Sequence, residues 1–145
     1  MATPIPPLPT KLTLEIVTPD RSLVHEDVDE VVVPAFDGYL GVLPGHTPLL
    51  ALLKVGELWY RKGSAKFYMY IAFGFTEVLP DRVTILADIA ERPEDIDIAR
   101  AERAKKRAEE RLARPPVEID FERARIAMMK SLIRLQVASR ARTRV

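Results

Sequence analysis

The stretch RVTILADIAERPEDIDIARAERAKKRAEERLARPP, residues 82–116, contains the change of pattern that decides the fold. Its first residues alternate between polar and apolar, which is typical of a half-buried strand. From Arg92-Pro93-Glu94-Asp95 onward the apolar residues recur every three or four positions, and the acidic side chains lie where a helix N-terminus favours them. The sequence therefore predicts a strand-rich part before this point and a helical part after it.

The helical part is predicted to form a hairpin of two antiparallel helices. Residues 96–114 carry a stripe of mostly small side chains, which permits a second helix to approach closely. This stripe consists of Ala101, Ala104, Ala108 and Leu112. Pro115 and Pro116 end the first helix because neither donates a backbone hydrogen bond, and Asp120 is expected to cap the second. The apolar face of the second helix, from Phe121 to Val137, is wider than the stripe, so apolar surface remains for another contact.

The part before Glu91 predicts short strands separated by turns and no helix. The expected strands are KLTLEIV (11–17), SLVH (22–25), DEVVVPA (29–35) and residues 49–53, 56–60, 66–72, 74–79 and 82–86. Strands at this spacing predict a β-sandwich or flattened barrel. The stretch GYLGVLPGHTPLL, residues 38–50, is interpreted as an uncharged contact loop shaped by glycine and proline. In FYMYIAFGF, residues 67–75, both faces are apolar; one fits the core and the other is either core or docking surface.

Composition limits the functional classes. Residues 1–90 carry seven basic and eleven acidic side chains, whereas residues 91–145 carry fifteen and ten, so only the second part favours an acidic partner. The Pro-rich segment MATPIPPLPT, residues 1–10, is expected to be a flexible leader without signal-peptide character. No uncharged run reaches the roughly 20 residues of a membrane-spanning helix. The absence of cysteine excludes disulfides and thiolate chemistry.

No pattern in the sequence predicts a catalytic or metal site. The chain has no GxxxxGK[ST], GxGxxG or HExxH motif, and neither His25 nor His46 lies near a pair of carboxylates at ligand spacing. The most informative polar feature is a stripe formed by Arg100, Arg103, Arg107, Arg111 and Arg114. It fits a solvated helix face, an acidic protein, a phosphate ligand or nucleic acid. The near-neutral overall charge and the lack of a recognisable nucleic-acid-binding motif argue against a nucleic-acid partner.

Four motifs in the same order resemble the epsilon subunit of the F-type (H+-transporting) ATP synthase, bacterial type. They are FDGYLGVLPGHTPLL (36–50), GFTEVLPDRVTILADIAER (74–92), IDIARAERAKKRAEERL (96–112) and IDFERARIA (119–127). The resemblance implies an α+β, mainly β fold, in which a sandwich of about ten short strands precedes a C-terminal antiparallel two-helix hairpin. The implied domains are the leader 1–10, the sandwich 11–90, which binds the gamma subunit and the c ring, and the regulatory hairpin 91–145.

The same resemblance implies a noncatalytic central-stalk subunit of the rotor. Such a subunit binds gamma, is seated on the ring of c subunits and couples proton translocation to ATP synthesis. It is peripheral, at the cytoplasmic face of the bacterial inner membrane. The family's hairpin is compact against the sandwich or extends into the catalytic alpha/beta head, where it inhibits ATP hydrolysis. The alternative, suggested by the basic hairpin alone, is an adaptor that binds an acidic protein or nucleic acid.

The resemblance also implies three sets of site residues. The c-ring contact comprises Gly38, Tyr39, Leu40 and His46. No cofactor is required, but regulatory ATP is expected at Glu91, Ile96, Asp97, Arg100, Ala101, Arg107, Lys130 and Arg134. In the extended state, the expected contacts with the beta subunit are Arg123, Arg125, Lys130 and Arg134.

Three positions depart from the family pattern. Tyr39 stands where some relatives carry a carboxylate, and Phe73 stands where a glycine is usual. Lys130 replaces the arginine of the best ATP binders, so weaker ATP binding is expected because lysine lacks the planar guanidinium fork.

Overall fold

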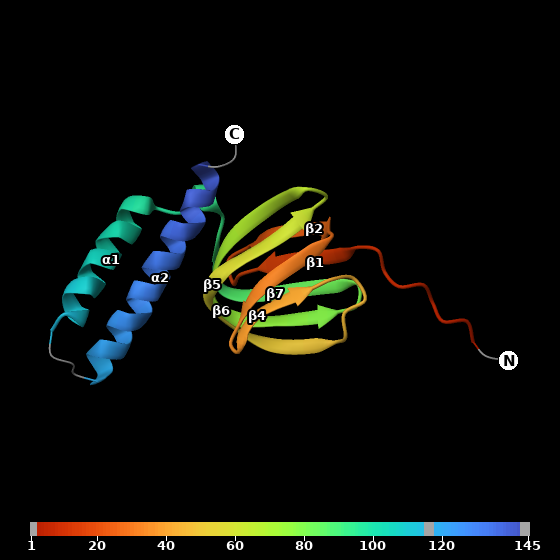
Figure 1. The fold of residues 1–145 in the computed structure, drawn as a ribbon, viewed down its shortest axis with the longest axis horizontal. Helices are drawn as coiled ribbons and strands as arrows, with labels where there is room; N and C mark the ends of the chain where they lie inside the picture. The colour runs from red at the N-terminus through yellow and green to blue at the C-terminus, as the bar shows by residue number, and fades with distance from the viewer. Residues whose placement is uncertain (1–2, 115–117, 143–145) are drawn as a thin grey trace.

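A computed structural model describes residues 3–114 and 118–142. A single seven-stranded sheet curls into a sandwich, and two helices lie beside it in an antiparallel pair (Figure 1). The strands are β1 (Leu12–Val17), β2 (Ser22–Val28), β3 (Glu30–Ala35), β4 (Gly38–Val42), β5 (Leu49–Lys62), β6 (Ala65–Leu79) and β7 (Arg82–Glu91). The helical elements are a short 3-10 turn η1 (Pro93–Asp95) and the helices α1 (Ile98–Leu112) and α2 (Glu118–Arg142). The predicted fold class, a β-sandwich followed by a two-helix hairpin, is confirmed.

The sheet has the order β2-β1-β7-β6-β5-β3-β4, with seven strands where about ten were expected. The figure of about ten came from the resemblance, whereas the sequence pattern itself indicated eight strands. The pattern divided β5 and β6 into two strands each, although each continues through a bend, and it did not include β4. At this bend the pairing between strands skips Lys54, Phe73 and Asp88. Phe73 has φ 62 and Gly74 has φ 120, both in the region that glycine tolerates best. Phe73 therefore adopts, at a steric cost, a backbone conformation that glycine adopts freely, which would explain the glycine that the resemblance implies at this position.

The stretch 38–42, expected to be part of a loop, forms strand β4. It pairs antiparallel with β3, from Val31 opposite Val42 to Ala35 opposite Gly38. β4 is the last strand of the sheet and has a neighbour on one side only. An edge strand needs fewer apolar side chains than a central strand, so its glycines obscured the alternation on which the sequence prediction relied.

The buried side chains form two separate clusters. The larger one fills the sandwich and contains side chains from all seven strands, with Val42 as the buried member from β4. Its most buried members include Leu12, Leu14, Ile16, Val28, Val31, Val33, Leu58, Ile71 and Ile85. The smaller one lies between the sheet and the hairpin and contains Val55, Tyr70, Ala72, Ile96, Val137 and Ala138. Because no described side chain of α1 or α2 belongs to the larger cluster, the sandwich closes its own core without the hairpin.

The apolar run 67–75 on β6 explains how the hairpin is held. Met69 and Ile71 point into the sandwich core, whereas Tyr70 and Ala72 belong to the cluster under α2. The second face of this strand, which fitted either core or docking surface from sequence, is therefore covered by the chain's own helix. α2 makes this contact, and α1 packs against α2, as the stripe of small residues predicted; Ala101 and Ala108 are 4% and 1% exposed.

The helix boundaries differ from those expected. The acidic residues Glu94 and Asp95 form part of η1, and α1 starts later, at Ile98. Its N-cap is Asp97, whose carboxylate accepts a hydrogen bond of 3.0 Å from the backbone N–H of Arg100. α2 starts at Glu118, so Asp120 lies inside its first turn and does not cap it. Pro115 and Pro116, expected to end the first helix, lie outside the described residues.

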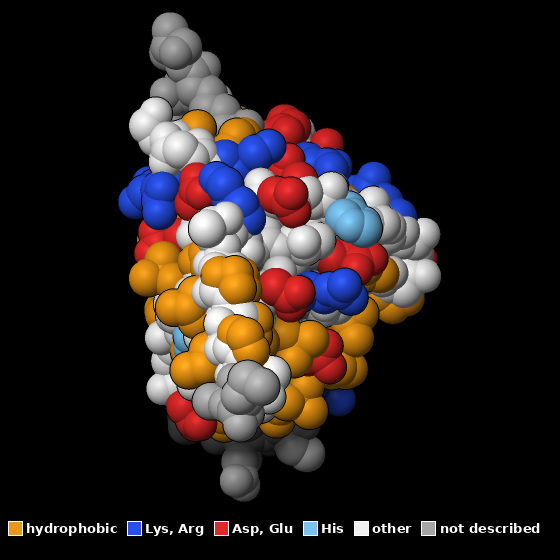
Figure 2. All heavy atoms as spheres, turned by 90° about the vertical axis from the view of Figure 1, so that its right-hand side faces the viewer, with side chains coloured by type: hydrophobic (Ala, Val, Ile, Leu, Met, Phe, Trp, Pro, Cys, Tyr) orange, Lys and Arg blue, Asp and Glu red, His pale blue; other side chains and the backbone are white. Residues whose placement is uncertain are grey.

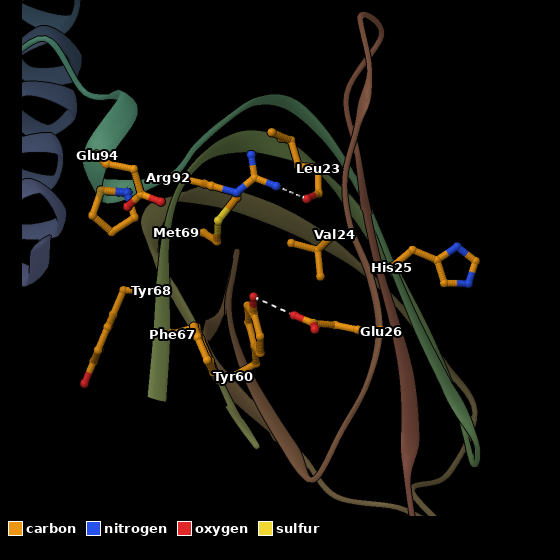
Figure 3. A pocket seen from close by; sticks show the side chains of 11 residues that line it. Leu23, Val24, His25, Glu26, Tyr60, Phe67, Tyr68, Met69, Arg92 and Glu94 are labelled. Atoms are coloured by element: carbon orange, nitrogen blue, oxygen red, sulfur yellow. Dashed lines mark hydrogen bonds between the residues drawn. The ribbon is translucent and has the colours of Figure 1, made fainter. Parts of the chain in front are cut away.

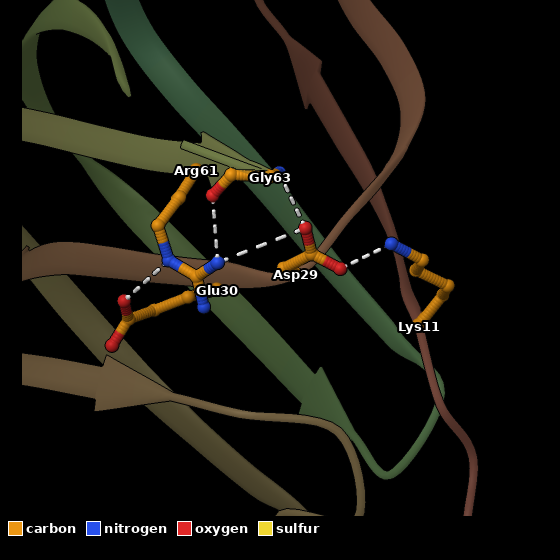
Figure 4. A network of polar contacts seen from close by, with 5 residues as sticks. All are labelled: Lys11, Asp29, Glu30, Arg61 and Gly63. Carbon is orange, nitrogen blue, oxygen red and sulfur yellow. Dashed lines mark hydrogen bonds and ion pairs between the residues drawn. The ribbon is translucent and has the colours of Figure 1, made fainter. Parts of the chain in front are cut away.

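A polar network joins two turns and the start of β1 at one end of the sandwich (Figure 4). Asp29, between β2 and β3, pairs with Lys11 and accepts a hydrogen bond of 2.6 Å from the backbone N–H of Gly63. Arg61 donates from Nε to Glu30 over 3.3 Å and from Nη1 to the carbonyl of Gly63 over 2.9 Å. The hydrogen bond from Lys11, followed by the one from Gly63, lowers the pKa of Asp29. These bonds fix the turn between β5 and β6 against the start of β1.

Candidate functional site

A polar pocket lies between the end of β7, the following linker and both helices. Its volume is about 410 Å³, within the range of small-molecule sites. Its lining residues are Glu91, Asp95, Asp97, Arg100, Ala101, Ala104, Arg107 and Arg134. Six of the eight residues expected from the family's nucleotide motif thus converge here, from segments up to 43 positions apart.

Three guanidinium groups and three carboxylates line this pocket, and the arginines are the groups that can bind an anion. Arg134 donates from Nε to Oε1 of Glu91 over 2.7 Å, which holds the guanidinium at the pocket. Among the described residues, the side chains of Arg100 and Arg107 form no ion pair. Two guanidinium groups that line a pocket without a carboxylate partner match the donors that bind phosphate oxygens. The N-terminus of α1 adds its backbone N–H groups and partial positive charge at the same place.

Two of the expected nucleotide residues lie elsewhere. Ile96 is 7% exposed and belongs to the apolar cluster under α2, so it supports the pocket without lining it. Lys130 lies one helical turn before Arg134, with Nζ 5.6 Å from the ring centroid of Phe73. The sequence analysis missed Asp95 and Ala104, which also line the pocket. Ala104 was within reach of sequence reasoning because it follows Ala101 by three positions, the spacing of one helix face.

Tyr70 lies beneath Arg134, whose guanidinium carbon is 4.5 Å from the centroid of the tyrosine ring. The tyrosine is fully buried, and among the described residues its hydroxyl finds no hydrogen-bond partner. Burial, with a smaller contribution from Glu91, raises the pKa of Tyr70 to about 12 from its ordinary value of 10.0. The hydroxyl therefore stays protonated under this helix up to high pH.

This raised pKa predicts an alkaline loss of stability. Between pH 10 and 12 the unfolded chain releases the Tyr70 proton while the folded chain keeps it, so stability falls as pH rises, by about 2 to 3 kcal/mol in total. Absorbance titration of tyrosinate should show one late phase that Tyr70→Phe removes. Tyr70→Phe should also flatten the stability profile over this range. A wild-type titration without a late phase would contradict the prediction.

A second candidate surface is an open groove of about 450 Å³ at the β3–β4 turn and the start of β5. It is lined by residues 35–40 and 49–52, so the expected ring-contact residues Gly38, Tyr39 and Leu40 lie together on it. Large apolar side chains of this groove are exposed, with Phe36 at 70% and Leu50 at 68%. Hydrophobic side chains also gather over the end of the sandwich that faces away from the hairpin (Figure 2). Exposed apolar patches of this kind are typical of protein docking surfaces.

The fourth expected ring-contact residue, His46, is not part of this groove. It lies in the loop after β4, where its Nδ1 is 2.7 Å from the carbonyl oxygen of Thr47. Tyr39 does line the groove and is 57% exposed, yet its hydroxyl accepts a hydrogen bond of 3.4 Å from the backbone N–H of Glu57 on β5. Tyr39 therefore connects the groove to β5, which is one of the strands that α2 contacts.

The expected beta-subunit contacts are spread over α2. Arg123, Lys130 and Arg134 share one helix face by their spacing, whereas Arg125 lies on the opposite face. Arg125 pairs with Glu122 on its own helix over 3.0 Å. Because Lys130 and Arg134 contact Phe73 and Glu91, half of this set is occupied while the hairpin is docked.

A third pocket, of about 390 Å³, lies between β2, β5, β6 and η1 (Figure 3). Its polar groups are bound to one another. Arg92 donates to the carbonyl of Leu23, and Tyr60 donates over 3.0 Å to Glu26, which also pairs with Lys62 at 2.7 Å. The hydrogen bond from Lys62, followed by that from Tyr60, lowers the pKa of Glu26 despite partial burial. These contacts tie the sheet edge to the start of the linker.

No three His, Asp or Glu side chains within residues 3–114 and 118–142 converge in a way that suits a metal ion. Across the same residues, neither helix is long and apolar enough to cross a membrane.

Comparison with known proteins matches both parts of the chain. Residues 11–93 match the family described as ATP synthase, Delta/Epsilon chain, beta-sandwich domain, and residues 94–139 match its long alpha-helix domain. The chain is 48% identical over 133 residues to the ATP synthase epsilon chain of Solibacter usitatus, covering 92% of this chain and 99% of the relative. It is 46% identical over 130 residues to that of Nitratidesulfovibrio vulgaris (strain DP4), with coverages of 90% and 97%.

The fold gives the same result. A chain in the cryo-EM structure of the Euglena gracilis mitochondrial ATP synthase, OSCP/F1/c-ring, superimposes with a TM-score of 0.80 at 25% identity. The superposition covers 94% of this chain and 86% of that chain. The chain therefore belongs to the ATP synthase epsilon-chain family, of the bacterial type.

Proposed function

We propose that this chain is the central-stalk subunit that links gamma to the c ring, and that its hairpin inhibits ATP hydrolysis by leaving the sandwich for the catalytic alpha/beta head. Coupling of proton translocation to ATP synthesis then depends on the sandwich, as a rigid noncatalytic connector at the cytoplasmic face of the inner membrane. The groove at residues 35–40 and 49–52 is the proposed ring contact, with Tyr39 as a neutral member. The exposed apolar side chains Phe75 and Leu86, opposite each other on β6 and β7 and outside this groove, offer a surface for gamma.

The separation of the two buried clusters carries the inhibitory part of this proposal. Within the part of the chain that the structure describes, the sandwich core takes no side chain from the helices, and the cluster under α2 is small. Undocking of the hairpin therefore leaves the main core intact, which is what a two-state element requires. Exposed apolar residues on α2, among them Phe121 and Leu132, give the undocked helix further surface to bury on a partner.

We also propose that ATP binds the pocket between the helices and stabilises the docked state. The convergence of Arg100, Arg107 and Arg134 on one pocket supports this proposal. Because the pocket takes residues from the linker, α1 and α2, a ligand that bridges them binds the docked hairpin better than the undocked one. Such a ligand shifts the population toward docking by its difference in affinity between the two states.

Removal of the hairpin tests the inhibitory function. In the reconstituted complex, deletion of residues 94–145 is expected to raise ATP hydrolysis by about fivefold or more, the lower end of ordinary coupling energies. Gamma and c subunits should still co-purify with the truncated chain after nuclease treatment, because the groove and the sandwich core remain.

Deletion of the leader, residues 1–10, is the matched control. It also shortens one terminus but leaves both helices in place, so hydrolysis should not change. Unchanged hydrolysis in the hairpin deletion would show that the hairpin is not inhibitory. Loss of gamma and c from a folded full-length chain, with nucleic acid retained, would instead favour the basic adaptor.

A further inference from the structure

The docked hairpin is held by two charged anchors on α2. The first, Arg134 with Glu91 and Tyr70, belongs to the proposed nucleotide pocket. The second is formed by Glu57 on β5 and Arg140 near the end of α2, with no member among the residues that line the pocket. The two anchors therefore differ in whether a bound nucleotide has access to them.

The second anchor has the geometry of a strong pair. Glu57 is 6% exposed, and Arg140 reaches it with two hydrogen bonds, Nη2 to Oε1 at 3.0 Å and Nε to Oε2 at 3.2 Å. Gln136 donates to Oε1 over 3.2 Å. The guanidinium carbon of Arg140 lies 4.5 Å from the ring centroid of Tyr68, so the cation also stacks on an aromatic face. The hydrogen bonding of Arg140 to the Glu57 carboxylate, which accepts it, raises the pKa of the arginine.

A bidentate arginine that reaches a buried carboxylate is worth more than an exposed pair, and it fixes orientation as well. Its absence from a docked helix would leave the Glu57 carboxylate buried with fewer partners, which disfavours docking. The residues concerned are 83 positions apart and join the sandwich directly to the end of α2.

We propose that Glu57 and Arg140 form a latch that keeps the hairpin docked when the nucleotide pocket is empty. The inference rests on the proposed function, in which docking and undocking of the hairpin regulate hydrolysis. The latch and ATP both favour the docked state but act through different residues. The latch therefore reduces how far ATP has to shift the population, and loss of the latch makes docking depend on ATP.

The test measures docking in the isolated full-length chain. The sequence contains no cysteine, so Ser64→Cys on the β5–β6 turn and Glu110→Cys on α1, both exposed, accept a fluorophore pair. Energy transfer between the dyes reports the ratio of docked to undocked chains. In this background, without nucleotide, Glu57→Gln is expected to lower the ratio by about tenfold to a hundredfold. Added ATP should restore part of it.

Glu30→Gln is the matched control, because Glu30 pairs with Arg61 of the sandwich domain and, among the described residues, has no ion pair with the hairpin. It should leave the docking ratio unchanged. Arg140→Met should lower the ratio like Glu57→Gln, and the double variant should lose little more than either single variant. Circular dichroism confirms folding of each variant; if Glu57→Gln fails to fold, Arg140→Met alone decides the test.

An unchanged ratio in both single variants, or an undocked wild-type hairpin without nucleotide, would overturn the latch. The hydrolysis assay of the reconstituted complex separates this failure from failure of the proposed function. If the latch variants undock but hydrolysis stays the same in them and in the hairpin deletion, the latch is supported and the inhibitory function fails. If the deletion raises hydrolysis but the latch variants remain docked, the opposite holds.

Discussion

Gly74→Ala is expected to lower the free energy of unfolding by about 4 kcal/mol or more and the melting temperature by about 10 °C or more. Gly74 lies at the bend of β6 with φ 120, a backbone conformation that strains any residue with a Cβ. A Cβ at this position would lie 2.1 Å from the carbonyl oxygen of Leu86 and 2.8 Å from Cα of Ala87. Both are backbone atoms of β7, so only a shift of the strand relieves the clash.

Gly63→Ala is the matched control for this experiment. Gly63 also has a positive φ, of 61, but nothing lies within 4 Å of the position its Cβ would take. It should cost only the strain of the left-handed conformation, about 1 to 2 kcal/mol. Thermal unfolding followed by circular dichroism gives both values. Similar melting temperatures for the two variants would show that β7 moves aside easily and that the bend is not close-packed.

The bend also shows why the strand pattern was predictable and the strand boundaries were not. Alternation identified β1, β2 and β7 and both halves of β5 and β6, because each half has one face on the core. The continuity of the long strands depends on a bend whose partners, such as Leu86 and Gly74, lie twelve positions apart. Alternation in one segment contains no information about the strand that packs across it, so a single strand was read as two.

The hairpin shows a similar limit. The stripe of small residues on α1 predicted its close packing on α2, since helical spacing alone places Ala101 and Ala108 on one face. The start of α1 was misplaced because the acidic residues of η1 have the same composition as a helix N-terminus. Asp97 is the cap because its carboxylate meets the N–H of Arg100, a contact that composition does not specify.

The candidate site was predictable only through the family resemblance. The arginine stripe of α1 fitted several partners, and nothing in its spacing distinguished Arg107, which lines the pocket, from Arg103, which lines a different groove with Glu102 and Lys106. Folding makes this distinction by docking α2 and its Arg134 on one side of α1. The Glu57–Arg140 pair likewise has no periodic signal, because its members lie on a strand and a helix far apart in sequence.

The same distinction between Arg107 and Arg103 gives the sharpest test of nucleotide binding. Isothermal titration of the full-length chain with ATP is expected to show binding, and Arg107→Ala should weaken it by about tenfold to a hundredfold through loss of a charge-assisted contact. Within the described residues Arg107 has no ion pair and Arg134 pairs with Glu91, so only the first can be removed without disturbing the docked hairpin. Arg103→Ala removes the same charge from the same helix and should leave the affinity unchanged.

Lys130→Arg extends this test to the second helix. Lys130 lies over Phe73, outside the pocket lining but one turn before Arg134 on the same helix face. The substitution is expected to tighten ATP binding, because an arginine there brings planar donors that can turn toward a ligand held by Arg134. The gain should be about tenfold or less, since the present lysine already supplies the positive charge. Equal weakening by Arg107→Ala and Arg103→Ala would mean that ATP senses only the overall charge of α1. In that case the pocket between the helices would not be the nucleotide site, and the effect of Lys130→Arg would vanish at high salt.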